Sequence, residues 1–92
     1  MTGTQLTKTV KVTNRRGLHA RASAKFVTMA SGLPAQVTVA KDGPCVVGTS
    51  IMGLMMLGAA MGDTITISAS GEGAEIALEQ LVQLVQDRFG EE

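Results

Sequence analysis

The sequence predicts an α+β fold of two layers, in which helices pack on a β-sheet. Segments with strict alternation of apolar and polar residues, typical of strands, are interleaved with segments whose apolar residues recur at helical spacing. Read along the chain, the order is β-α-β-β-α-β-α. Some links between strands have hairpin length and each helix has one apolar stripe, which together favour helices layered on a sheet.

The first half of the chain supplies two strands and one helix. Residues 5–13 are rich in Thr and Val and predict a strand, and a turn follows at 14–17. The next helix is expected over about residues 20–31, because Gly32 and then Pro34 end the pattern. Its apolar stripe is expected to comprise Ala20, Ala24, Val27 and Ala30. A second strand is expected around residues 35–39, where small apolar residues alternate with polar ones.

The second half continues with a turn at residues 42–44 and a short returning strand at 45–47. Ser50 is placed to cap a short apolar helix over residues 51–57. Residues 64–69 alternate most clearly and predict the last strand. The longest helix is expected from residue 74 to about 89, with an apolar stripe formed by Ala77, Leu78, Leu81, Val85 and Phe89.

The composition bounds the class of protein. A chain of 92 residues predicts a single domain over residues 1–92, and an apolar content of 45% supports a packed core. The one cysteine, Cys45, cannot form an internal disulfide, which fits a reducing compartment. No apolar run suggests a membrane span, and the polar start lacks the apolar centre of a signal peptide. We therefore expect a soluble cytoplasmic protein without a membrane partner.

The charges are unevenly placed although the net charge is zero. The first acidic residue is Asp42, and seven basic residues precede it: Lys8, Lys11, Arg15, Arg16, Arg21, Lys25 and Lys41. The stretch from Glu72 onwards is mostly acidic. This asymmetry indicates a basic face for an anion or an acidic partner, with two ordinary solvated faces as the alternative.

His19 is the single histidine and comes directly before a predicted helix start. Unpaired N–H groups and a partial positive charge at a helix start bind anions. An imidazole with an ordinary pKa of about 6.5 is largely neutral at pH 7, which leaves one ring nitrogen free as a nucleophile. Arg21 follows two residues later and could neutralise a phosphoryl group on that nitrogen. The alternative is a histidine that only caps the helix or lies on the surface.

Residues 14–21, Asn-Arg-Arg-Gly-Leu-His-Ala-Arg, resemble the histidine-containing phosphocarrier (HPr) family of the bacterial phosphotransferase system. Residues 50–55, Ser-Ile-Met-Gly-Leu-Met, resemble the family's second segment, which carries its regulatory serine. Residues 62–71 resemble its last strand and turn. The resemblance covers roughly residues 7–89, with three motifs in the family's order, and is far more specific than a lone histidine motif.

This resemblance implies an open-faced two-layer sandwich, with a four-stranded antiparallel sheet in the order 1-4-2-3 and three helices on one face. It also implies roles for three residues. His19 corresponds to the family's phosphorylated histidine, which uses Nδ1, and Arg21 to the arginine that assists it. Ser50 corresponds to the serine that an ATP-dependent HPr kinase/phosphorylase modifies in bacteria that have one.

The resemblance further implies a monomeric carrier without turnover of its own, needing no cofactor or metal. Enzyme I, charged from phosphoenolpyruvate, would phosphorylate His19, and a IIA-type protein would accept the group. In the family the short helix contacts partners. The residues expected at the docking surface are Arg15, Arg16, Lys25, Ile51, Met52 and Met55.

Three points stay open in the sequence: the effect of Ala22, the choice between two functions, and the branch that the protein serves. Members of the family often carry proline directly after the arginine, and this chain has Ala22 there, which is a good helix former and leaves the chemistry intact. The alternative function is a purely regulatory protein-binding domain of the same fold, controlled at Ser50. A nucleic-acid partner is not expected, given a sequence pI of about 6.6. Whether the chain serves sugar uptake or a nitrogen-type branch depends on its partners.

Overall fold

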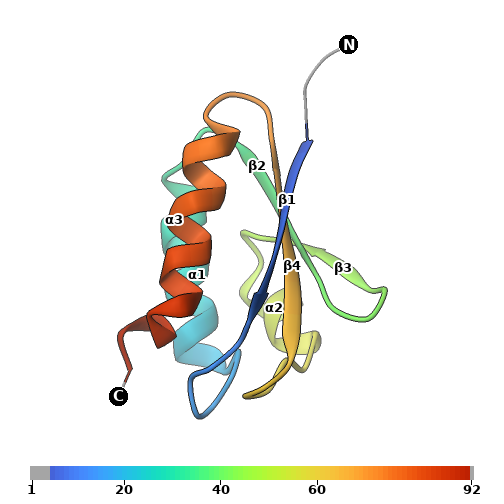
Figure 1. Ribbon diagram of the computed structural model, residues 1–92, viewed down its shortest axis with the longest axis vertical. Coiled ribbons are helices and arrows are strands. Elements are labelled where there is room, and N and C mark those ends of the chain that lie inside the picture. Colours follow the sequence, from blue (N-terminus) through green and yellow to red (C-terminus); the bar gives the residue numbers. More distant parts are fainter. Residues whose placement is uncertain (1–4, 92) are drawn as a thin grey trace.

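A computed structural model describes residues 5–91, and these form the expected alternation of strands and helices (Figure 1). In chain order the elements are β1 (Gln5–Lys11), α1 (Ala20–Ser31), β2 (Gln36–Ala40), β3 (Cys45–Val47), α2 (Ile51–Met56), β4 (Thr64–Ser70) and α3 (Ala74–Gln86). A short 3-10 turn, η1 (Arg88–Gly90), follows α3. The predicted order of elements is confirmed.

The strands of the described residues form one antiparallel sheet in the order β1-β4-β2-β3. Strand β4 lies inside the sheet and pairs with β1 from Gln5↔Ser70 to Lys11↔Thr64, and with β2 on its other side. The apolar residues of β4 are buried and its alternate residues face away, as a sheet with one covered face requires. The sheet order implied by the resemblance is therefore confirmed.

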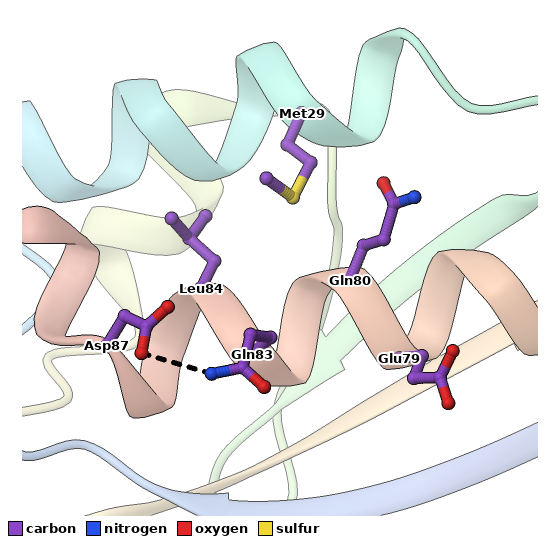
Figure 2. A pocket seen from close by; sticks show the side chains of 6 residues that line it. All are labelled: Met29, Glu79, Gln80, Gln83, Leu84 and Asp87. Carbon is purple, nitrogen blue, oxygen red and sulfur yellow. Dashed lines mark hydrogen bonds between the residues drawn. The ribbon is translucent and has the colours of Figure 1, made fainter.

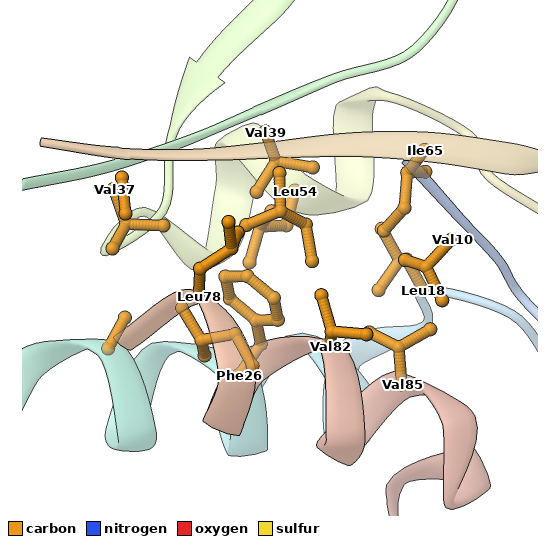
Figure 3. Close-up of a cluster of buried hydrophobic side chains, with 14 of the residues drawn as sticks. Val10, Leu18, Phe26, Val37, Val39, Leu54, Ile65, Leu78, Val82 and Val85 are labelled. Atoms are coloured by element: carbon orange, nitrogen blue, oxygen red, sulfur yellow. The ribbon is translucent and has the colours of Figure 1, made fainter. Parts of the chain in front are cut away.

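The three helices cover one face of this sheet (Figure 1). Helices α1 and α3 pack against each other, and α3 also lies against β1 and β4. Between the layers, Phe26 of α1, Leu54 of α2 and the inward residues of the strands form one apolar core (Figure 3). A methionine-rich and nearly aromatic-free sequence thus builds its core around Phe26 and Phe89, both fully buried.

The first half of the chain differs from the expectation in two details, one in α1 and one in β1. In α1 the buried residues are Ala22, Ser23, Phe26 and Ala30, so the predicted stripe is confirmed at Ala30. It was wrong at its start, where Ala20 is exposed and Ala22 is buried instead. Alanines occur around most of this helix, and the bulk of Phe26 decides which side packs inward. Strand β1 ends at Lys11, two residues earlier than expected. Just beyond it, the N–H of Val12 donates to the carbonyl of Asp63 at 2.8 Å.

Helix α3 ends at Gln86 and does not reach Phe89. Arg88, Phe89 and Gly90 have φ values of 57°, 55° and 76°, in the left-handed region that ends helices. Phe89 is buried as predicted, but through this turn and not through an extra helical turn. The turn carries the chain from the end of α3 towards the start of α1. Within residues 5–91, no helix has the length and apolar character needed to cross a membrane.

Candidate functional site

His19 is the N-cap of α1, as its place before the helix predicted. Its backbone is extended, and its carbonyl accepts from Ser23 N–H, which begins the helical hydrogen bonds. The backbone N–H of Arg21 donates to His19 Nδ1 at 3.1 Å. Because a ring nitrogen that accepts a hydrogen bond carries no proton, Nδ1 is the bare nitrogen of the neutral ring. The lone pair of Nδ1 therefore points at the helix N-terminus.

The approach to His19 is fixed by a close backbone contact. Gly17 has φ +64°, and a Cβ at this position would lie 2.3 Å from the carbonyl oxygen of Ala59. The next residue, Leu18, is buried and donates its N–H to the same Ala59 carbonyl at 3.0 Å. The loop that follows α2 thus holds the segment that carries His19, and only glycine fits at position 17.

The other ring nitrogen meets a carboxylate that the sequence motifs did not reveal. Nε2 of His19 lies 2.8 Å from Oε2 of Glu91, and the Asn14 side-chain N–H donates to Oε1 of the same carboxylate at 3.1 Å. Burial raises the pKa of the Glu91 carboxyl, but the hydrogen bonds from Asn14 and His19 and the favourable electrostatic interactions with His19 and Lys25 outweigh it. The pKa of Glu91 therefore lies below its ordinary value, and the group is ionised at neutral pH.

Three arginine residues line a cavity together with the histidine. An open cavity of about 270 Å³ is lined by Arg15, Arg16, His19, Arg21 and Glu91. Arginine binds phosphate oxygens through several N–H donors of one rigid plane, and it keeps its charge at any physiological pH. The structure therefore brings together His19, Arg21 and two further predicted basic residues, Arg15 and Arg16, in one place. Such a cavity suits a tetrahedral dianion next to a nucleophilic ring nitrogen.

A larger cavity, of about 440 Å³, lies between α1 and α3 (Figure 2). Its lining comes from Met29 and five residues of α3 and its end: Glu79, Gln80, Gln83, Leu84 and Asp87. The Gln83 side chain donates to Asp87 Oδ1 at 3.0 Å. None of these six side chains carries a positive charge, and Glu79 and Asp87 are carboxylates, so this cavity would repel a phosphoryl dianion.

The remaining candidate residues lie outside the cavity at His19. Ser50 is the N-cap of α2, since its Oγ accepts from Gly53 N–H at 2.9 Å. On α2, Ile51, Met52 and Met55 are exposed by 40%, 71% and 42%. Lys25 is on α1, where its ammonium donates to the Phe89 carbonyl at 2.7 Å. Helix α2 packs against α1, whose N-cap is His19, and the loop after α2 contacts the histidine segment at Ala59.

A family model described as "PTS HPr component phosphorylation site" matches residues 6–87. The chain belongs to the HPr family. Its matched region includes the whole sheet, all three helices and the segment that carries His19. Membership in the HPr family supports the role of a bacterial phosphotransferase-system phosphocarrier.

Members of the HPr family are similar to this chain over nearly its full length. Phosphocarrier protein HPr of Cupriavidus necator is 41% identical over 86 residues, covering 94% of this chain and 97% of its own. Phosphocarrier protein NPr of Shewanella violacea is 38% identical and covers 96% and 97%. A crystal structure of HPr from Thermoanaerobacter tengcongensis has a TM-score of 0.90 at 42% identity, covering 95% and 98%. A dimer of HPr from the same organism has a TM-score of 0.75 at 43% identity, covering 89% and 94%.

Proposed function

We propose that Nδ1 of His19 accepts a phosphoryl group from enzyme I and passes it to a IIA-type protein. The observation that carries the proposal is the bare Nδ1 at the N-terminus of α1, inside a cavity lined by three arginines. The lone pair of Nδ1 is the nucleophile, and the charges that would stabilise a phosphoryl group are already in place. The protein would act as a covalent carrier that partners charge and discharge, without turnover of its own.

Transfer requires the imidazole to turn slightly, because the lone pair of Nδ1 is engaged by the N–H of Arg21. As the ring turns, this N–H becomes free to donate to a phosphoryl oxygen. The Arg21 guanidinium lines the same cavity and supplies a full positive charge. The helix start and the side chain of Arg21 would thus stabilise the same dianion from two sides.

Docking would use the basic residues Arg15, Arg16 and Lys25 together with an apolar patch on α2. We define this patch as Ile51, Met52 and Met55. Exposed apolar side chains that lie together on a short helix commonly mark a contact surface, and methionine adapts to more than one partner. The basic residues would steer an acidic partner towards the histidine. Partners that exchange a phosphoryl group must separate quickly, which suits a small contact of this kind.

Control through Ser50 is part of the same proposal. A phosphate on its Oγ would add about −1.5 to −2 charges at the first turn of α2, next to Ile51 and Met52. The N-terminus of α2 tolerates that charge, so the fold would be kept while contact with an acidic partner is weakened. A IIA-type acceptor, a host kinase, a cytoplasmic location and a monomeric state complete the proposal. Sedimentation of the purified chain would test the monomeric state.

The test is phosphorylation by purified enzyme I and phosphoenolpyruvate, followed by mass spectrometry. The expected result is one acid-labile phosphate on wild type and none on His19→Ala. The matched control is Lys8→Ala, which leaves Asn14 and the cavity at His19 unchanged. Lys8 is an exposed residue of β1, and this variant should be labelled like wild type. Equal labelling of His19→Ala would overturn the assignment. In a second step, the phosphorylated wild type is offered to candidate IIA proteins.

A further inference from the structure

The turn after α3 is built to deliver one carboxylate to His19. Two non-glycine residues in succession, Arg88 and Phe89, take up left-handed conformations that such residues rarely adopt. The fully buried Phe89 ring anchors the turn from the core side, and the Lys25 ammonium binds its carbonyl at 2.7 Å. Strained backbone of this kind persists only where its surroundings hold it, so the place of Glu91 is well determined.

Both oxygens of the Glu91 carboxylate are used. Oε2 faces Nε2 of His19 at 2.8 Å and Oε1 accepts from Asn14 Nδ2 at 3.1 Å. Asn14 is itself buried, and the same nitrogen also donates to the Gly17 carbonyl at 2.8 Å. Because Asn14 is fixed by the turn that precedes His19, the carboxylate is held at the ring edge opposite Nδ1.

We propose that Glu91 is a positioning residue for the phosphorylation of His19. It keeps the proton on Nε2, so that Nδ1 is the nucleophile, and it is the counter-ion of the phosphorylated ring. This inference rests on the proposed function, since it names how the same histidine is oriented and charged. Carboxylates that accept from one ring nitrogen fix the tautomer of a histidine and stabilise its cationic form.

The transfer step shows why the counter-ion matters. The lone pair of Nδ1 forms a bond to phosphorus, while the bond from phosphorus to the donor's leaving nitrogen breaks and its electron pair stays on that nitrogen. Nε2 keeps its proton, so the product ring is a cation that bears a phosphoryl group on Nδ1. Onward transfer releases the ring as neutral imidazole, a much better leaving group than an imidazolate anion.

The charges around the ring are otherwise positive. Arg15, Arg16 and Arg21 line the cavity and Lys25 lies at the turn, whereas Glu91 is the one carboxylate among the cavity's lining residues. Without Glu91, the cationic ring would have only its own phosphoryl group to balance its charge among these four cations. An opposite charge in contact favours the charged form of an ionisable group. Glu91 therefore raises the pH up to which the phosphorylated ring keeps its proton on Nε2.

The experiment uses phosphoramidate, a small donor that phosphorylates histidine without enzyme I, on the full chain and on Glu91→Gln and Glu91→Ala. In this reaction the P–N bond of phosphoramidate breaks and ammonia leaves. Phosphorus NMR then distinguishes phosphate on Nδ1 from phosphate on Nε2. Wild type should be labelled on Nδ1. Glu91→Gln, which keeps an acceptor oxygen, should follow wild type, whereas Glu91→Ala should divide its label between the two nitrogens.

The second readout is the pH profile of phosphohistidine hydrolysis, which separates the charge of Glu91 from its hydrogen bond. The midpoint of the profile should fall by about one pH unit in Glu91→Gln, so that hydrolysis between the two midpoints slows up to about tenfold. A merely structural residue would leave this midpoint unchanged. Wild-type regiochemistry in Glu91→Ala together with a wild-type profile in Glu91→Gln would overturn the proposal.

The same experiment separates this proposal from the proposed function. Phosphoramidate needs no partner protein, so the effects of Glu91 can appear even if enzyme I leaves wild type unlabelled, and only the proposed function then fails. Conversely, enzyme I can label His19 normally while both Glu91 variants behave like wild type, and only the positioning role then fails. A thermal melt of each variant confirms that the folded protein was compared.

Discussion

Gly17 lies directly against the backbone of Ala59, so close that a Cβ on Gly17 would fall 2.3 Å from the Ala59 carbonyl oxygen. This contact joins the turn before His19 to the loop after α2. Two segments that are distant in the sequence are therefore coupled at one glycine, and they are the segments to which we assign phosphorylation and docking. Because of this coupling, Gly17 affects both the stability of the fold and the position of the segment that carries His19.

Gly17→Ala should lower the free energy of unfolding by about 2–4 kcal/mol, because it combines a left-handed φ with a backbone clash. Gly58→Ala is the matched control. Gly58 also has a left-handed φ, of +67°, but nothing lies within 4 Å of its Cβ position, so about 1 kcal/mol is expected. Chemical denaturation of both variants checks the difference. Equal losses would mean that the loop yields to the new methyl group.

Arg21→Ala should slow phosphoryl transfer from enzyme I by about ten- to a hundredfold, since one charge-assisted contact contributes roughly 1.5–3 kcal/mol. The backbone N–H that caps Nδ1 remains in this variant, so the fold should be unchanged. Stopped-time transfer assays measure the effect, with Lys8→Ala on the exposed face of β1 as a control of equal charge. Unchanged kinetics would mean that the guanidinium is a bystander.

Ser50→Asp should slow phosphorylation of His19 with a nearly unchanged melting temperature. Asparagine and aspartate both cap helices well, so Ser50→Asn is a neutral control that keeps the cap. Ser50→Ala loses the bond from Gly53 and should cost about 1 kcal/mol of stability without slowing transfer. If the Asp and Asn variants transfer at the same rate, negative charge at this position does not block docking.

Met52→Glu should weaken transfer from enzyme I by about tenfold or more, because it places a charge in the centre of the apolar α2 patch. Ile76→Glu is the matched control, since Ile76 of α3 is also exposed, by 57%. Transfer rates measured over a range of carrier concentrations report the effect as a raised KM. Similar losses in both variants would assign the effect to net charge and not to the patch.

Glu91→Gln should reduce the loss of stability on acidification. The folded-state pKa of Glu91 is depressed, so its contribution is present above the unfolded value of about 4.5 and is lost as the pH falls through the folded pKa. Wild type and Glu91→Gln should therefore differ in free energy of unfolding at pH 7 and converge near pH 3. A difference that is constant from pH 7 to pH 3 would contradict an ionised Glu91 in the folded state.

The sequence predicts the features that depend on neighbours in the chain. The starts of α1 and α2, the capping of α2 by Ser50 and the alternation of β4 all follow from local patterns, and each is found. The inward side of α1 was misplaced at its start because several alanines fit more than one helical phase, whereas the position of Phe26 depends on the core. Local pattern cannot choose between such phases.

Glu91 illustrates the opposite limit. The helical spacing of Phe89 suggested that α3 continues, although the chain turns there into left-handed conformations. That turn brings Glu91 to His19 across a separation of 72 residues. No local motif reports a contact of this length, so the carboxylate at the site was visible only in the fold. Asn14, in contrast, belongs to the motif at residues 14–21, but its contact with Glu91 was equally hidden.

The pairing of the first strand with the last has a consequence for the newly made protein. Strand β1 leaves the ribosome well before its partner β4, which begins at residue 64, and before the carboxylate of Glu91. Contacts between distant segments form late, because the chain between them must first be closed into a loop. We therefore expect a nascent or truncated chain that ends at residue 86 to expose His19 without its counter-ion and without its finished cavity. Phosphoryl transfer would then become well oriented only after the segment that carries Glu91 has emerged and folded against His19.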